Sequence, residues 1–75
     1  MISKNTLLIL GFKNLSEYFQ YITDSYINGQ KFQAQDLYQE MSRSECFDFA
    51  DWIEIEQICD HLELTSSEFI RFLSQ

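Results

Sequence analysis

Proline is absent from this chain of 75 residues, glycine occurs only as Gly11 and Gly29, and cysteine occurs only as Cys46 and Cys59. Because no proline-rich, glycine-rich or low-complexity stretch indicates a linker, we expect residues 1–75 to form a single helical domain. The cysteine usage and the lack of a recognisable secretory signal predict free thiols and a cytoplasmic location. No apolar run approaches the roughly 20 residues that a membrane-spanning helix needs, so we expect no membrane partner.

Positive charge is also scarce in this sequence. Twelve acidic residues face five lysines and arginines, the net charge is −7, and neither Lys nor Arg occurs between Arg43 and Arg71. Autonomous binding to DNA or RNA normally requires a basic patch, and this charge repels phosphates. We therefore expect no direct nucleic-acid ligand and a partner with a basic protein surface, such as a nucleic-acid-binding protein.

Motifs that carry chemistry are missing as well. The sequence has no recognisable nucleophile motif and no phosphate-binding glycine loop. Four potential metal ligands, Cys46, Cys59, Asp60 and His61, lack the close ligand pairs of zinc sites, and both cysteines fall on apolar stripes where a free thiol behaves as a small hydrophobe. His61 is expected in the last turn of its helix, where a cation suits the helix dipole. We expect no catalytic site, metal or cofactor, and a protein that is not an enzyme.

The features that are present indicate an all-α fold. Apolar residues make up 45% of the chain and aromatic residues 16%, which is too much for a disordered chain. Helix-start signatures, in which a capping side chain is followed three residues later by a Glu that reaches back to the cap, occur at Asn14 with Glu17, Ser42 with Glu45, Asp51 with Glu54, and Thr65 with Glu68. We expect a small bundle of four to five short helices, with an N-terminal apolar segment, residues 7–10, that is either a strand paired across a dimer or a buried helical turn.

Apolar spacing locates the helices. A first helix after Asn14 ends where Gly29 supplies a left-handed C-cap, and a second helix covers residues 31–41. The next apolar stripe changes phase between Ile53 and Ile55, which predicts a kink or break near Asp51 with Ile55 turned inward. Four large apolar side chains fall off these stripes, and either they are exposed as partner anchors or the helices have wide apolar faces: Tyr21, Ile27, Phe32 and Phe47.

Carboxylates form the most regular polar pattern. The candidate partner-binding residues recur every three or four positions: Glu45, Asp48, Asp51, Glu54, Glu56, Asp60 and Glu63. Helical neighbours at these spacings lie about 5–6 Å apart, close to the roughly 6–7 Å between phosphates along a nucleic-acid strand. One interpretation is a solvated face whose acids also cap helices, and the other is an acidic surface that faces a partner.

Residues 54–73, EIEQICDHLELTSSEFIRFL, resemble the two helices of ribbon-helix-helix repressors, in which a Ser/Thr-Ser-Glu-Phe-Ile-Arg run opens the second helix. The matching residues are Leu62, Leu64, Thr65, Ser67, Glu68, Phe69, Ile70 and Arg71. The resemblance implies a C-terminal helix-turn-helix hairpin and, in that family, a dimer whose strand before the first helix reads the DNA major groove. This sequence has the acidic, helix-like SECFDFADW at the strand position and Glu63 where the family's turn usually has glycine.

The size, acidity and aromatic content are also similar to small accessory proteins of phages and mobile elements, including inhibitors of host defence nucleases. The leading functional hypothesis is a protein-binding module whose acidic helical face mimics a nucleic acid and inhibits a nuclease or regulator. One alternative is a dimeric DNA-binding regulator that uses the C-terminal hairpin. Another is a structural or assembly subunit whose exposed aromatic residues become buried in an oligomer.

Overall fold

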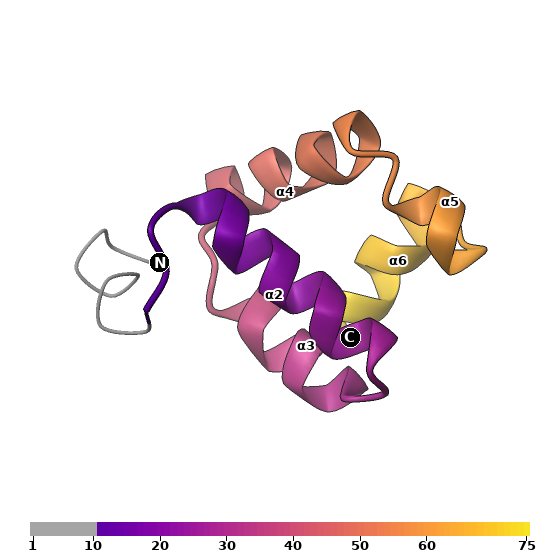
Figure 1. The fold of residues 1–75 in the computed structure, drawn as a ribbon, viewed down its shortest axis with the longest axis horizontal. Helices are drawn as coiled ribbons and strands as arrows, with labels where there is room; N and C mark the ends of the chain where they lie inside the picture. Colours follow the sequence, from indigo (N-terminus) through magenta and orange to yellow (C-terminus); the bar gives the residue numbers. More distant parts are fainter. Residues whose placement is uncertain (1–10) are drawn as a thin grey trace.

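In the computed structural model, which describes residues 11–75, the chain forms five helices and no strand (Figure 1). The helices are α2 (Leu15–Ile27), α3 (Lys31–Gln39), α4 (Arg43–Ile55), α5 (Cys59–Leu62) and α6 (Ser66–Leu73). This confirms the all-α fold. The expectation for residues 7–10 lies outside the described residues.

The first two helices form the expected hairpin and lie side by side (Figure 1). Gly29 has a φ of +85°, the left-handed conformation that glycine adopts without strain. Its N–H donates to the Tyr26 carbonyl at 3.1 Å, and the Gln30 N–H donates to the Ser25 carbonyl at 2.8 Å. These two bonds are the Schellman motif, which satisfies the last carbonyls of α2 and reverses the chain into α3.

Two of the predicted capping boxes are present. Ser42 and Glu45 exchange hydrogen bonds at the start of α4, at 2.7 and 3.3 Å. Thr65 and Glu68 do the same at the start of α6, with both bonds at 3.1 Å. Each box satisfies two backbone donors that a helix start leaves free, so these starts are encoded locally.

The start of α2 follows a variant of this pattern. The Asn14 side chain accepts a hydrogen bond from the Glu17 N–H at 3.0 Å, as expected. The Glu17 carboxylate, however, accepts from the N–H of Lys13 at 2.7 Å, one residue before the cap. The cap is therefore confirmed, while the expected return bond is shifted by one residue.

The predicted break near Asp51 is wrong. Helix α4 continues without interruption to Ile55, and Asp51 is an exposed residue in its middle. The chain changes direction only after this end, at Gln57, which has a left-handed φ of 55°. This placement leaves Ile53 fully buried and Ile58 half-buried against the core, whereas Ile55, expected inward, is 76% exposed.

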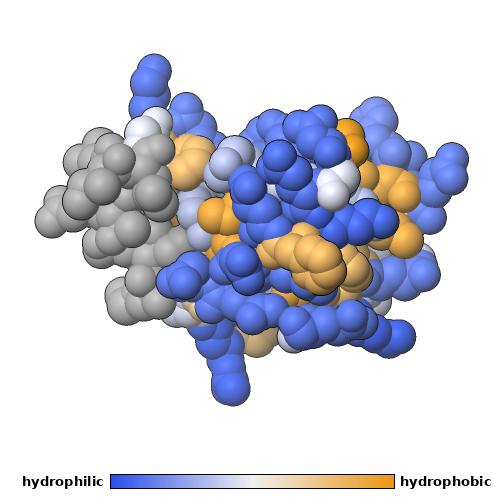
Figure 2. All heavy atoms as spheres, turned by 90° about the horizontal axis from the view of Figure 1, so that it is seen from below, coloured by the Kyte–Doolittle hydropathy of each residue, from blue (hydrophilic) through white to orange (hydrophobic). Residues whose placement is uncertain are grey.

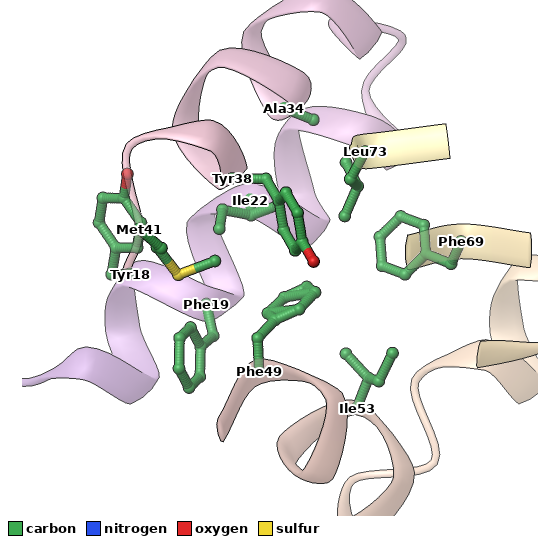
Figure 3. Packing of buried hydrophobic residues seen from close by; sticks show 10 residues of the cluster. All are labelled: Tyr18, Phe19, Ile22, Ala34, Tyr38, Met41, Phe49, Ile53, Phe69 and Leu73. Carbon is green, nitrogen blue, oxygen red and sulfur yellow. The ribbon is translucent and has the colours of Figure 1, made fainter. Parts of the chain in front are cut away.

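Side chains from four helices fill one core (Figure 3). Its buried members are Tyr18, Phe19, Ile22, Ala34, Tyr38, Met41, Phe49, Ile53, Phe69 and Leu73. The ring of Phe49 lies at its centre, with ring centroids 5.3 Å from Phe19 of α2, 5.8 Å from Tyr38 of α3 and 6.0 Å from Phe69 of α6. Aromatic pairs at these distances add about 0.5–1.5 kcal/mol each beyond their buried area. Phe49 thus joins α4 to every other long helix.

Two glutamines of α3 fasten the C-terminal end of α6. The Gln35 side chain donates to the Phe72 carbonyl at 2.9 Å. The Gln39 side chain donates to the carbonyls of Leu73 at 3.3 Å and Gln75 at 2.8 Å. Carbonyls at the end of a helix lack the usual donor four residues later, and the Phe72 carbonyl also accepts the Gln75 N–H at 3.3 Å, so the glutamines add a C-terminal cap supplied by a neighbouring helix. Within residues 11–75, no helix has both the length and the apolarity to cross a membrane.

Two phenylalanines of α4 provide a matched test of this packing. We expect Phe49→Ala to lower the free energy of unfolding by about 3–5 kcal/mol, because it leaves a cavity among four rings. We expect Phe47→Ala, at a site that is 66% exposed, to change it by less than about 0.5 kcal/mol. Urea titration followed by the fluorescence of Trp52, which packs against Phe49, measures both values. If Phe49→Ala does not fold, Phe49→Leu supplies the comparison, and equal losses at the two positions would contradict this packing.

The buried tyrosines predict a loss of stability at high pH. Burial, with smaller contributions from Glu40 and Glu45, raises the pKa of Tyr18 to about 12. Burial and a hydrogen bond with Cys46 raise the pKa of Tyr38 to about 12. Because these values exceed the unfolded value of about 10, folding favours the protonated phenols. The stabilisation is complete below pH 10 and is lost as the pH rises toward 12.

Urea midpoints at pH 9 and pH 11.5 test this expectation. The urea midpoint of the wild type should be lower at pH 11.5 than at pH 9. The midpoint of Tyr18→Phe/Tyr38→Phe should decrease clearly less, because phenylalanine cannot ionise at these sites. An equal fall in both proteins would show that other groups cause the alkaline transition.

Candidate protein-binding surface

The outward side of α4 carries three of the predicted carboxylates. Asp48, Asp51 and Glu54 are exposed, whereas Phe49 and Ile53 of the same helix are fully buried. Their spacing of three residues places successive side chains about 5–6 Å apart along one face. The structure therefore places this part of the predicted row in solvent, as a short acidic strip.

Glu45 does not belong to that strip. It is half-buried, and its carboxylate accepts the Ser42 N–H at 2.7 Å within the capping box of α4. Its position in the sequence fits the three-residue spacing of the row, but its side chain is turned toward the start of the helix. Glu45 thus stabilises α4, and a variant at this position would combine any effect on a partner with the loss of a cap.

The other predicted carboxylates follow the break after α4. Glu56 is the C-cap residue of α4, Asp60 lies in the first turn of α5, and Glu63 follows α5 in the left-handed conformation with a φ of 57°. All three are exposed. Because Gln57 redirects the chain between the two helices, the expected continuous row is divided into a strip on α4 and a separate group around α5.

Two large apolar side chains share the outward side of α4 with the acidic strip. Phe47 is 66% exposed and Ile55 is 76% exposed, and Asp51 lies four residues from each of them. Exposure was one of the two alternatives predicted for Phe47, and it is confirmed. The exposure of Ile55 was not predicted, because the apolar stripe placed this residue on the inward side. Counting in steps of four from Phe47 through Asp51 would have placed Ile55 on the outward face.

Exposed apolar residues also occur near the α2–α3 turn. Ile27 is 56% exposed and Phe32 is 83% exposed, while Tyr21 of α2 is 41% exposed. Figure 2 views the molecule from the side on which α3 lies, where hydrophilic atoms surround small apolar areas. Asp24 lies three residues before Ile27 and Asp36 four residues after Phe32, with the cationic Lys31 between them, so carboxylates are fewer here than around Phe47 and Ile55 and are mixed with a positive charge.

Reactive side chains are dispersed in the described part of the chain. Cys46 and Cys59 are free, half-buried and packed against the core. His61 is exposed in the last turn of α5, as expected. Among residues 11–75, no three His, Cys, Asp or Glu side chains come together in a group that could hold a metal ion.

A shallow depression of about 370 Å³ lies along the first turns of α2. Its lining residues are Gly11, Phe12, Glu17, Gln20, Tyr21 and Asp24. Two of these carboxylates already accept hydrogen bonds, Glu17 from the Lys13 N–H and Asp24 from the Gln20 side chain. None of the residues singled out in the sequence as a potential ligand or nucleophile lines it.

The C-terminal hairpin differs from the ribbon-helix-helix arrangement. The four-residue α5 is followed by a turn and α6, and Glu63 has a left-handed conformation in the turn where the family usually has glycine. The preceding segment, however, is α4, a helix of 13 residues, where that family has its DNA-reading strand. The described structure therefore has a helix, and no strand, at the position that reads DNA in that family.

Known proteins do not identify this arrangement: no family model, no curated protein and no solved structure matches the chain. The chemistry of the exposed residues on α4 and α5 is therefore the basis for the function proposed below.

The two left-handed residues around α5 predict a gain in stability on substitution by glycine. Gln57 and Glu63 are exposed and have φ values of 55° and 57°, which disfavour residues with a Cβ by roughly 1 kcal/mol. We expect Gln57→Gly and Glu63→Gly to be more stable than Gln57→Ala and Glu63→Ala by up to about 1 kcal/mol each. Chemical denaturation of the four variants measures this difference, and alanine variants as stable as the glycine variants would contradict the left-handed assignment.

Proposed function

We propose that this protein is a non-enzymatic, cytoplasmic protein-binding module that presents the acidic side of α4 and α5 to a basic surface of a nucleic-acid-binding protein. Occupying that surface would inhibit a nuclease or regulator by taking the place of its nucleic acid. The small accessory proteins of phages and mobile elements that this chain resembles in size, acidity and aromatic content include inhibitors of host defence nucleases.

The observation that carries the proposal is the exposed acidic strip on α4, without a lysine or arginine on the same stretch of chain. Asp48, Asp51 and Glu54 follow one another at spacings of three residues, and the next basic residue after Arg43 is Arg71. Like charges at this spacing destabilise a helix by a few tenths of a kcal/mol per pair. A surface needed only for solubility would usually mix both signs of charge.

The sign of the charge also determines the class of partner. An acidic strip attracts a cationic groove and accelerates its encounter with the protein, especially at low salt. Partner contact would relieve the repulsion among the carboxylates, because each would gain a cation nearby. The strip is therefore suited to binding a protein that normally holds phosphates.

The two alternatives have different support. No feature of the described residues favours direct DNA binding: Arg71 is the only Lys or Arg in the C-terminal hairpin, and α4 occupies the position of the DNA-reading strand. An assembly role gains support from the exposed apolar residues Ile27, Phe32 and Phe47. Light scattering distinguishes it, since an assembly subunit would form oligomers by itself at high concentration.

Two pairs of aspartates test the proposed function with matched chemistry. Asp48→Asn/Asp51→Asn removes two charges from the strip, and Asp24→Asn/Asp36→Asn removes two from α2 and α3, so both variants carry the same net charge. We expect the immobilised wild-type protein to capture basic nucleic-acid-binding proteins from host lysate and duplex DNA to release them. The strip variant should capture roughly tenfold less while being slightly more stable, and the α2–α3 variant should capture as the wild type does.

Glu45 is left unchanged in this comparison because its carboxylate caps α4. Mass spectrometry of the captured proteins and urea titration of the variants give the two measurements. If both aspartate pairs reduce capture equally, only net charge matters, and the assignment of the strip as the binding site is wrong.

A further inference from the structure

The outward side of α4 has an apolar component that the acidic strip alone does not explain. Phe47 and Ile55 are separated by eight residues, which places both on one side of the helix at a separation of ~12 Å along its axis. They are 66% and 76% exposed. Phe47 and Ile55 do not contribute to the core, to which α4 supplies the fully buried Phe49 and Ile53.

Charges surround these two side chains. Asp51 lies between them at four residues from each, and Asp48 and Glu54 lie directly beside Phe47 and Ile55 in the sequence, on the same outward side. Arg43, the first residue of α4, lies four residues before Phe47 and is the cation at that end of the surface. The surface therefore combines two apolar anchors with three carboxylates, and a mimic of phosphates alone would have no use for the anchors.

We infer that the outward side of α4 is a docking site for a basic amphipathic helix of the partner protein. Apolar residues two turns apart on that helix cover Phe47 and Ile55, and flanking lysines or arginines pair with Asp48, Asp51 and Glu54. The inference rests on the proposed function and specifies the form of the basic partner. Helices that bind other helices through apolar anchors at such spacings are a common mode of recognition.

Charge complementarity selects this occupant over the others. A second copy placed on the same surface by a twofold axis would set these carboxylates against their own counterparts, with repulsion in place of pairing. An anionic lipid surface or a nucleic acid would be repelled in the same way. A basic helix satisfies both components, because its cations pair with the strip while its apolar residues remove the anchors from water.

Two synthetic peptides separate the apolar component from the charge. The first is a helical 14-residue peptide of leucine and lysine with the leucines on one face, and the second has serine in place of every leucine. In isothermal titration calorimetry at 0.15 M salt, we expect the wild type to bind the leucine peptide at least roughly tenfold more tightly than the serine peptide. Phe47→Ser/Ile55→Ser should bind the two peptides equally.

The chain provides a matched control for this variant. Ile27 and Phe32 are another exposed isoleucine and phenylalanine, located on either side of the α2–α3 turn, where Lys31 lies between Asp24 and Asp36 in place of an uninterrupted row of carboxylates. In Figure 1, α3 and α4 lie on opposite sides of α2, so a peptide on α4 does not reach this turn. Ile27→Ser/Phe32→Ser should therefore retain the preference for the leucine peptide, and circular dichroism should show that both variants keep their helices.

Three results would overturn the inference. The first is an equal affinity of the wild type for both peptides, and the second is a loss of the preference in Ile27→Ser/Phe32→Ser. The third is a wild-type dimer in light scattering that Phe47→Ser/Ile55→Ser converts to a monomer, since a second copy would then cover the surface. In the first case the acidic strip could still bind by charge, and the capture experiment with Asp48→Asn/Asp51→Asn decides that separately.

Discussion

The ring of Phe49 lies among rings from α2, α3 and α6, and this single packing arrangement determines how α4 is rotated about its own axis. Because Phe49 and Ile53 must face the core, the residues on the opposite side of the helix must face solvent. Those residues include Phe47, Asp51 and Ile55. The exposure of the acidic strip and its two apolar neighbours is thus a consequence of the core, and any account of function has to explain why this side of α4 has the composition that it has.

Much of the fold could be predicted because its signals are local. The capping boxes at Ser42 and Thr65 and the left-handed Gly29 depend on residues within four positions of each other, and all three are present. Apolar spacing predicted the presence of α2 and α3 for the same reason, since repeats of three and four residues are typical of one helical face. The meeting of Phe19, Tyr38 and Phe69 around one ring depends on tertiary packing, which no local signal predicts.

The parts that could not be predicted depend on tertiary structure or on ambiguous local signals. Asp51 with Glu54 has the same spacing as the true capping boxes, and only the continuity of α4 through the core distinguishes it from them. Gln57 carries no signal for a left-handed conformation, so the break was expected six residues too early and Ile55 was placed on the wrong side. Glu45 fits the acidic row by spacing, yet its carboxylate serves the cap. Spacing alone cannot separate a carboxylate that caps a helix from one that faces solvent.

The proposed interaction is the binding of a basic amphipathic helix to the outward side of α4. Amide chemical shifts of the isotope-labelled protein during titration with the leucine–lysine peptide test it directly, because they report the contact residue by residue. We expect the largest shift changes at Phe47, Asp48, Asp51, Glu54 and Ile55, with residues 27–36 at the other end of the hairpin unchanged. Changes centred on the α2–α3 turn, or spread evenly over all exposed carboxylates, would contradict the claim.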